Sequence, residues 1–174
     1  MGEPGSSLDA ERADLLQALG KQRYFLRYTV RDLTDAQAAQ RTTVSELCLG
    51  GLIKHVTLVE RQWANFILDG PASRRGGTDE ASSVDWADGF RMLDGETLAG
   101  LLAEYERVAG RTDELAAAFP DLDASHPLPE APWFEPGARW SARRVLLHVV
   151  AETAQHAGHA DIIREALDGA KSMG

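Results

Sequence analysis

Hydrophobic residues recur three, four or seven positions apart along four long stretches of this chain, the spacing typical of one face of an amphipathic helix. Polar segments separate these stretches, and none shows the convincing alternation of a β-strand. The first helix is expected to run from a cap at Ser6, Ser7 or Asp9 to about Asp32. The other three helices are expected over residues 45–69, 96–119 and 141–168.

Residues that favour helix ends support these boundaries. Ser141 is a typical N-cap for the last helix, and Gly169 is suited to its C-terminal end. The pair Gly70-Pro71 ends the second helix, whose first turns are weakened by Gly50 and Gly51.

The connections between the predicted helices are long. Residues 33–43 favour a short helical turn, which leads to a capping signal near Ser45 for the second helix. Residues 71–95 are rich in Gly and Ser and are predicted to form a loop. Residues 120–140 contain five prolines, which exclude a continuous helix but allow a short hairpin. The pattern predicts one all-α domain over residues 1–174, a four-helix bundle whose long connections leave room for a crossover topology.

Composition narrows the class of partner. The chain has 174 residues, of which 44% are hydrophobic and 26% charged, as is typical of a soluble globular protein. Its net charge of −9 argues against nucleic acid, because phosphate binding needs a basic surface. No apolar run approaches the ~18 residues of a membrane span, and the N-terminus lacks the features of a signal peptide. A single cysteine, Cys48, excludes an intramolecular disulfide and suits the reducing cytoplasm, where we expect the chain to act. With nucleic acid and membrane disfavoured, the expected partner is a small molecule.

Polar groups are interleaved with core positions in the segment HVVAETAQHAGHAD, residues 148–161. A helix turns about 100° per residue, so Glu152 and His156 fall in the sector of the apolar core face. These two residues are one turn apart, close enough to share a ligand. His148 and His159 lie at the edge of that sector.

The second predicted helix carries a further polar group on its apolar stripe. His55 lies between Leu52 and Val59, so packing of the two helices can bring it to Glu152 and His156 in the interior. A buried carboxylate is costly unless it is paired, and a divalent metal supplies that pairing. Two histidines and one carboxylate are a ligand set of catalytic zinc and of non-haem iron, with a position left for water or substrate. The alternative is a hydrogen-bonded pair of Glu152 and His156 without a metal, but the contribution of two helices favours the metal.

Two segments, GLIKHVTLVERQW (51–63) and LLHVVAETAQHAGHADIIREALDG (146–169), resemble the DinB/YfiT-like metalloenzyme superfamily. The chain is most similar to the branch related to the mycothiol-dependent maleylpyruvate isomerase, over nearly its whole length. The resemblance implies a homodimer and a divalent metal, Zn²⁺ first, with Ni²⁺ or Fe²⁺ as alternatives. The residues that match the family pattern are the three ligands His55, Glu152 and His156, and the glycine Gly158.

The same resemblance implies a metal-dependent transferase that joins a low-molecular-weight thiol, mycothiol or bacillithiol, to small electrophiles in detoxification or stress response. The chain ends soon after the last helix, so neither the extra C-terminal domain of the full isomerase nor a maleylpyruvate substrate is expected. Two other functions remain open. One is a non-catalytic bundle that binds a metal or small molecule, and the other is a metal-dependent hydrolase with water as the nucleophile.

Further residues are candidates for this site. His159 is the candidate catalytic residue, as a proton carrier or an orienting group, because imidazole titrates near neutrality. His148 is expected to be a polar residue at the edge of the buried face. All four tryptophans are candidates for a pocket above the metal, although Trp63 is favoured as a core residue. Trp86 and Trp133, in the two long loops, are expected to bind the substrate or thiol cofactor in that pocket, with a dimer contact as the alternative. Cys48 is expected to be a small buried hydrophobe.

Overall fold

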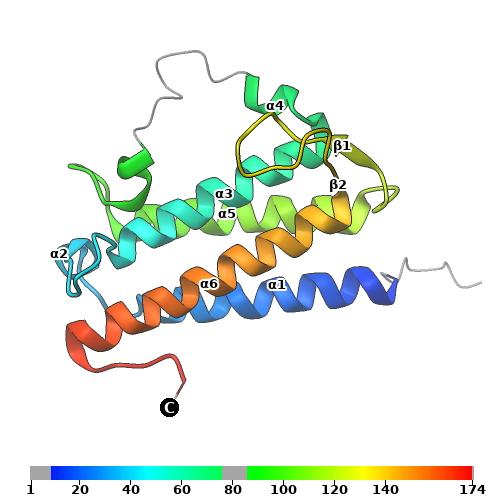
Figure 1. The fold of residues 1–174 in the computed structure, drawn as a ribbon. Coiled ribbons are helices and arrows are strands. Elements are labelled where there is room, and N and C mark those ends of the chain that lie inside the picture. The colour runs from blue at the N-terminus through cyan, green and yellow to red at the C-terminus, as the bar shows by residue number, and fades with distance from the viewer. Residues whose placement is uncertain (1–8, 76–85, 174) are drawn as a thin grey trace, which may run out of the picture.

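Four long helices form the body of the computed structural model, which describes residues 9–75 and 86–173. They are α1 (Ala10–Tyr28), α3 (Leu49–Asp69), α5 (Leu98–Ala118) and α6 (Ala142–Asp168) (Figure 1). The connections hold α2 (Asp35–Ala39), α4 (Ala72–Arg75), the 3-10 helix η2 (Trp86–Phe90), and the strands β1 (Ser125–Pro127) and β2 (Arg139–Ser141). The prediction of an all-α four-helix bundle is confirmed. Within the described residues, no helix has the length and apolar character needed to cross a membrane.

The long helices pack as two parallel pairs that run in opposite directions. α1 and α6 lie side by side and begin at one end of the bundle, whereas α3 and α5 begin at the other end (Figure 1). α6 also packs against α3 in an antiparallel contact. The chain must return along the bundle between the end of α3 and the start of α5. That long connection is therefore a crossover, for which the sequence left room.

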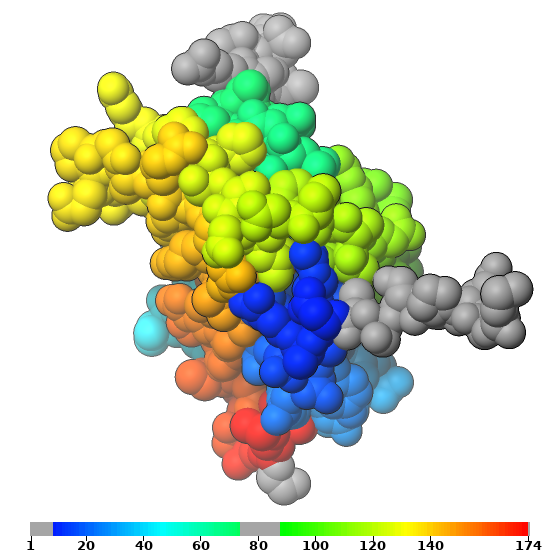
Figure 2. Space-filling view, turned by 90° about the vertical axis from the view of Figure 1, so that its right-hand side faces the viewer, coloured from blue at the N-terminus to red at the C-terminus, as the bar shows by residue number. Residues whose placement is uncertain are grey.

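The proline-rich connection between α5 and α6 forms the predicted short hairpin. β1 and β2 pair antiparallel, with His126 opposite Trp140. Seen from the end where α6 begins, this segment projects to one side of the bundle (yellow in Figure 2). The short helical turn predicted before the second long helix is also present as α2, and Thr34 and Gln37 form a capping box at its start.

Capping side chains explain several helix ends. Asp9 caps α1 by accepting a hydrogen bond from the backbone nitrogen of Arg12 at 2.9 Å. Ser141 caps α6 in the same way, from the backbone nitrogen of Arg144 at 3.1 Å. Gly169 ends α6 in the left-handed conformation, with φ of 79°. These three predicted ends are confirmed.

Two helix boundaries lie about four residues from the prediction, whereas the ends of α5 differ from it by only one or two residues. α3 begins at Leu49 rather than near Ser45, because the Ser45 hydroxyl accepts a backbone hydrogen bond within a local turn. α1 ends at Tyr28 rather than near Asp32, because the buried guanidinium of Arg164 in α6 binds two backbone carbonyls of the following turn, each at 2.8 Å. Both differences come from side-chain hydrogen bonds that compete with continuation of the helix.

A polar layer separates two hydrophobic clusters in the core, one that includes Leu52 and one that includes Phe66. In this layer Arg23 of α1 donates to both carboxylate oxygens of Glu60 in α3, at 2.5 and 3.2 Å. Arg23 also donates to Asp113 of α5 at 2.7 Å. Glu60 is 0% exposed, so the ion pair lies fully inside the bundle. The hydrophobic pattern of the sequence does not predict it.

Candidate metal centre

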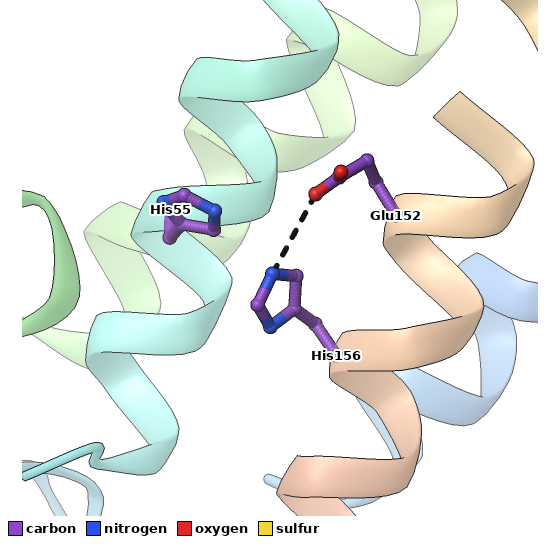
Figure 3. Close-up of side chains that lie close together, drawn as sticks. All are labelled: His55, Glu152 and His156. Carbon is purple, nitrogen blue, oxygen red and sulfur yellow. Dashed lines mark ion pairs between the residues drawn. The ribbon is translucent and has the colours of Figure 1, made fainter. Parts of the chain in front are cut away.

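Two histidines and a glutamate converge where α3 packs against α6 (Figure 3). His55 comes from the second turn of α3, and Glu152 and His156 lie one turn apart on α6. The two histidines are 5% and 9% exposed, and the glutamate is half-buried. The side chains extend from the two helices into the space between them (Figure 3), so the structure brings together the three residues that the sequence predicts.

The spacing of the three side chains suits a shared cation. One ligand atom from each lies within 4.8 Å of the other two. Nε2 of His156 is 3.7 Å from Oε2 of Glu152, and the ring centroids of His55 and His156 are 4.8 Å apart. Zinc sites hold such atoms about 2.0–2.2 Å from the ion. The three atoms would therefore move closer together on binding one ion.

The same distances bear on the metal-free alternative. At 3.7 Å, Glu152 and His156 are beyond the length of an N–H···O hydrogen bond, about 2.7–3.2 Å. His148 Nε2 lies at the same distance, 3.7 Å, from the other carboxylate oxygen of Glu152. The Glu152 carboxylate is thus flanked by two imidazoles, a grouping of nitrogen and oxygen ligands that suits a cation.

Burial and neighbouring charges set the protonation of the site. Burial, together with the nearby His156, lowers the pKa of His55 from 6.5 to about 4. The His156 imidazole holds the pKa of the Glu152 carboxyl below its usual value, against the opposing effect of burial. At neutral pH His55 is therefore neutral and Glu152 is ionised, the forms in which each ligates a metal. The donor set fits a divalent cation.

The two flanking histidines lie on different sides of this group. His148 lines the adjoining pocket, and its ring centroid is 4.9 Å from those of Trp63 and Trp140. The Nδ1 atom of His159 is 3.4 Å from that of His156, and His159 is absent from the lining of the pocket among the described residues. This place suits a residue that orients His156. The catalytic role of His159 remains a prediction.

A pocket of about 750 Å³ opens onto the three converging residues. Trp133 lines this pocket and is 75% exposed. Its role in binding the substrate or thiol remains a prediction. The side chain of Trp86, the other predicted binding residue, lies outside the described residues. The pocket is also lined by four other aromatic rings: Trp63, for which the sequence favoured the core, Trp140, and the two rings that the sequence did not assign to it, Phe90 and Phe134. Three of these four belong to connections or the hairpin, where no periodic pattern could have placed them.

Comparison with known protein families gives a match over most of the chain. A family model described as mycothiol-S-transferase matches residues 14–169, which include all four long helices except the first residues of α1. No curated protein is significantly similar to the chain. The match covers both helices that supply the converging residues.

Proposed function

The chain belongs to the mycothiol-S-transferase family, and we propose that it joins mycothiol, or a related low-molecular-weight thiol, to a small organic electrophile. The observation that carries this proposal is the convergence of His55, Glu152 and His156 on one pocket. Small-molecule sites commonly have volumes of about 300–1,000 Å³. The pocket, at about 750 Å³, has room for an electrophile beside the thiol.

Each of the three residues has a defined part in this proposal. His55 and His156 bind the metal through neutral imidazole nitrogens, and Glu152 binds it through a carboxylate oxygen. When bound, a divalent metal supplies the positive charge that keeps a thiol in its reactive thiolate form at neutral pH. We propose Zn²⁺, which accepts this ligand set in catalytic sites, with Ni²⁺ and Fe²⁺ as alternatives that elemental analysis would separate.

The proposed reaction forms one C–S bond and breaks one bond to a leaving group. The thiol sulfur supplies the electron pair for the new bond, and the leaving group departs with the electron pair of the old one. The thiol proton passes to a base. We assign this role to His148, because it lines the pocket and lies 3.7 Å from Glu152.

The walls of the pocket suit an uncharged organic substrate. Trp63 and Trp140 stack with ring centroids 4.8 Å apart and planes at 22°, and Phe134 packs edge-on against Trp140. Gln62 and Gln155 add amide groups that can orient polar atoms of the thiol or the electrophile. Such rings displace water, and charge interactions inside the pocket are stronger where water is displaced.

A thiol-consumption assay tests the proposal. Zinc-loaded protein mixed with mycothiol and 1-chloro-2,4-dinitrobenzene is expected to consume thiol faster than the mixture without protein. His55→Ala is expected to return the rate to the protein-free level, because it removes one of the three ligands. His126→Gln is the control, since this half-buried histidine of β1 lies outside the site, and it is expected to keep the rate.

Two outcomes would contradict the transferase. One is a rate that His55→Ala leaves unchanged. The other is a metal-loaded protein that adds nothing to the uncatalysed rate, which would support a non-catalytic binding bundle. Turnover of p-nitrophenyl acetate without any thiol would support the hydrolase instead.

A further inference from the structure

The glycines at positions 50 and 51 lie where the chain after η2 crosses the first turn of α3. A Cβ atom on Gly51 would lie 1.9 Å from the backbone oxygen of Phe90 and 2.8 Å from the backbone nitrogen of Arg91. A Cβ atom on Gly50 would lie 2.2 Å from Sδ of Met92. Only a residue without a side chain allows so close an approach of two backbones. The two glycines, which lower the helix propensity of this turn, therefore allow residues 90–92 to pack directly against the backbone of α3.

Other contacts hold the same segment against α3. The Sγ atom of Cys48, a buried residue as predicted, lies 3.8 Å from the backbone oxygen of Phe90. Lys54 donates to the backbone oxygen of Arg91 at 3.5 Å and pairs with Glu96 at 2.8 Å. The segment is thus attached on both sides of the first turn of α3, which carries the two glycines and directly precedes the turn of His55.

Docking places the Phe90 ring on the His55 imidazole. The ring centroids are 3.9 Å apart, and the planes are at 20°. Phe90 also lies near His156, with centroids 6.2 Å apart, and it lines the pocket. A phenyl ring stacked this closely opposes rotation of the imidazole, because turning the imidazole would drive it into the phenyl face. It also covers that face of the imidazole from water.

We propose that Phe90 is a positioning residue for His55. Docked through Gly51, its ring fixes the plane of the His55 imidazole and so directs the ligating nitrogen toward Glu152 and His156. This inference rests on the proposed function, because it takes His55 as a metal ligand. Residues that orient a ligand typically contribute about 10–100-fold to metal affinity, and the apolar shell of a site controls its access to solvent.

Zinc affinity, measured by competition with a chromogenic chelator, tests this role. Phe90→Leu keeps an apolar side chain without the flat ring, and it is expected to weaken Zn²⁺ binding about tenfold. Gly51→Ala is expected to have a similar effect, because the new Cβ must displace the backbone at Phe90. Phe90→Tyr keeps the ring and is expected to bind zinc as the wild type does. Gly110→Ala is the matched control, since nothing lies within 4 Å of a Cβ at this helical glycine of α5.

Two further measurements separate positioning from a structural role. If Phe90→Leu and Gly51→Ala lose stability in urea but bind zinc as the wild type does, the role is structural and the inference is overturned. In metal-free protein with ¹³C-labelled histidine, the ring current of Phe90 is expected to shift the His55 ring signals, and both variants are expected to remove that shift. His55 signals that neither variant moves would also overturn the inference. Failure of the wild type to bind zinc, with the shift present, would count against the proposed function and not against the positioning of the ring.

Discussion

Replacement of Arg23 by methionine is expected to lower the free energy of unfolding by about 3–5 kcal/mol. The change leaves the fully buried carboxylate of Glu60 without its guanidinium partner. It also removes the two hydrogen bonds, at 2.5 and 3.2 Å, that join α1 to α3 across the core. Urea denaturation followed by circular dichroism measures the loss.

The exposed pair of Arg27 and Glu106 provides the control on the same helix. Its side chains are 49% and 64% exposed, so Arg27→Met is expected to change stability by less than about 1 kcal/mol. The double variant Arg23→Met/Glu60→Leu is expected to recover much of the loss, because well-packed apolar residues often replace a buried ion pair at little cost. Equal losses for Arg23→Met and Arg27→Met would contradict this account of the polar layer.

Alanine at His55 is expected to weaken Zn²⁺ binding about a hundredfold or more. Removal of a ligand is expected to lower the metal affinity at least as much as removal of a residue that orients a ligand. For such an orienting residue, a loss of about 10–100-fold in metal affinity is typical. Chelator competition measures the affinity directly. Added zinc is also expected to raise the Tm of the wild type and not that of His55→Ala, since a metal that binds only the folded state stabilises it.

Two other histidines make this experiment specific. His126 donates from Nε2 to the backbone oxygen of Ile67 at 3.2 Å, away from the site, so His126→Gln is expected to bind zinc as the wild type does. His159→Ala is expected to weaken binding about tenfold if His159 orients His156. Wild-type affinity in His55→Ala would remove His55 from the ligand set.

The three converging residues could be predicted because each depends on local helix geometry. Glu152 and His156 are separated by one turn and surrounded by valines and alanines, so their face of α6 follows from the sequence alone. His55 follows in the same way from its neighbours on α3. The flanking pair, His148 and His159, lies at the edge of the face. Which edge borders the pocket depends on the antiparallel packing of α3 against α6, and a helical projection does not contain that information.

The contacts of Phe90 and Arg23 with distant segments could not be predicted. Phe90 lies in a connection without periodicity, and a glycine pair in a helix predicts weakness as readily as close approach. Arg23 looks like any solvated charge on α1, because its partner Glu60 lies 37 positions away. No pattern of residues in the sequence marks a dimer interface, so the homodimer remains a prediction. The cytoplasmic location also remains a prediction.

The metal content of the purified protein tests the central claim most directly, namely that His55, Glu152 and His156 form a metal site. Elemental analysis of protein prepared without chelators or metal-affinity resin is expected to find about one equivalent of a divalent transition metal per chain, with zinc foremost. His55→Ala prepared in parallel is expected to retain little of it. Fewer than about half an equivalent of any transition metal in the wild type, even after incubation with Zn²⁺, would contradict the account.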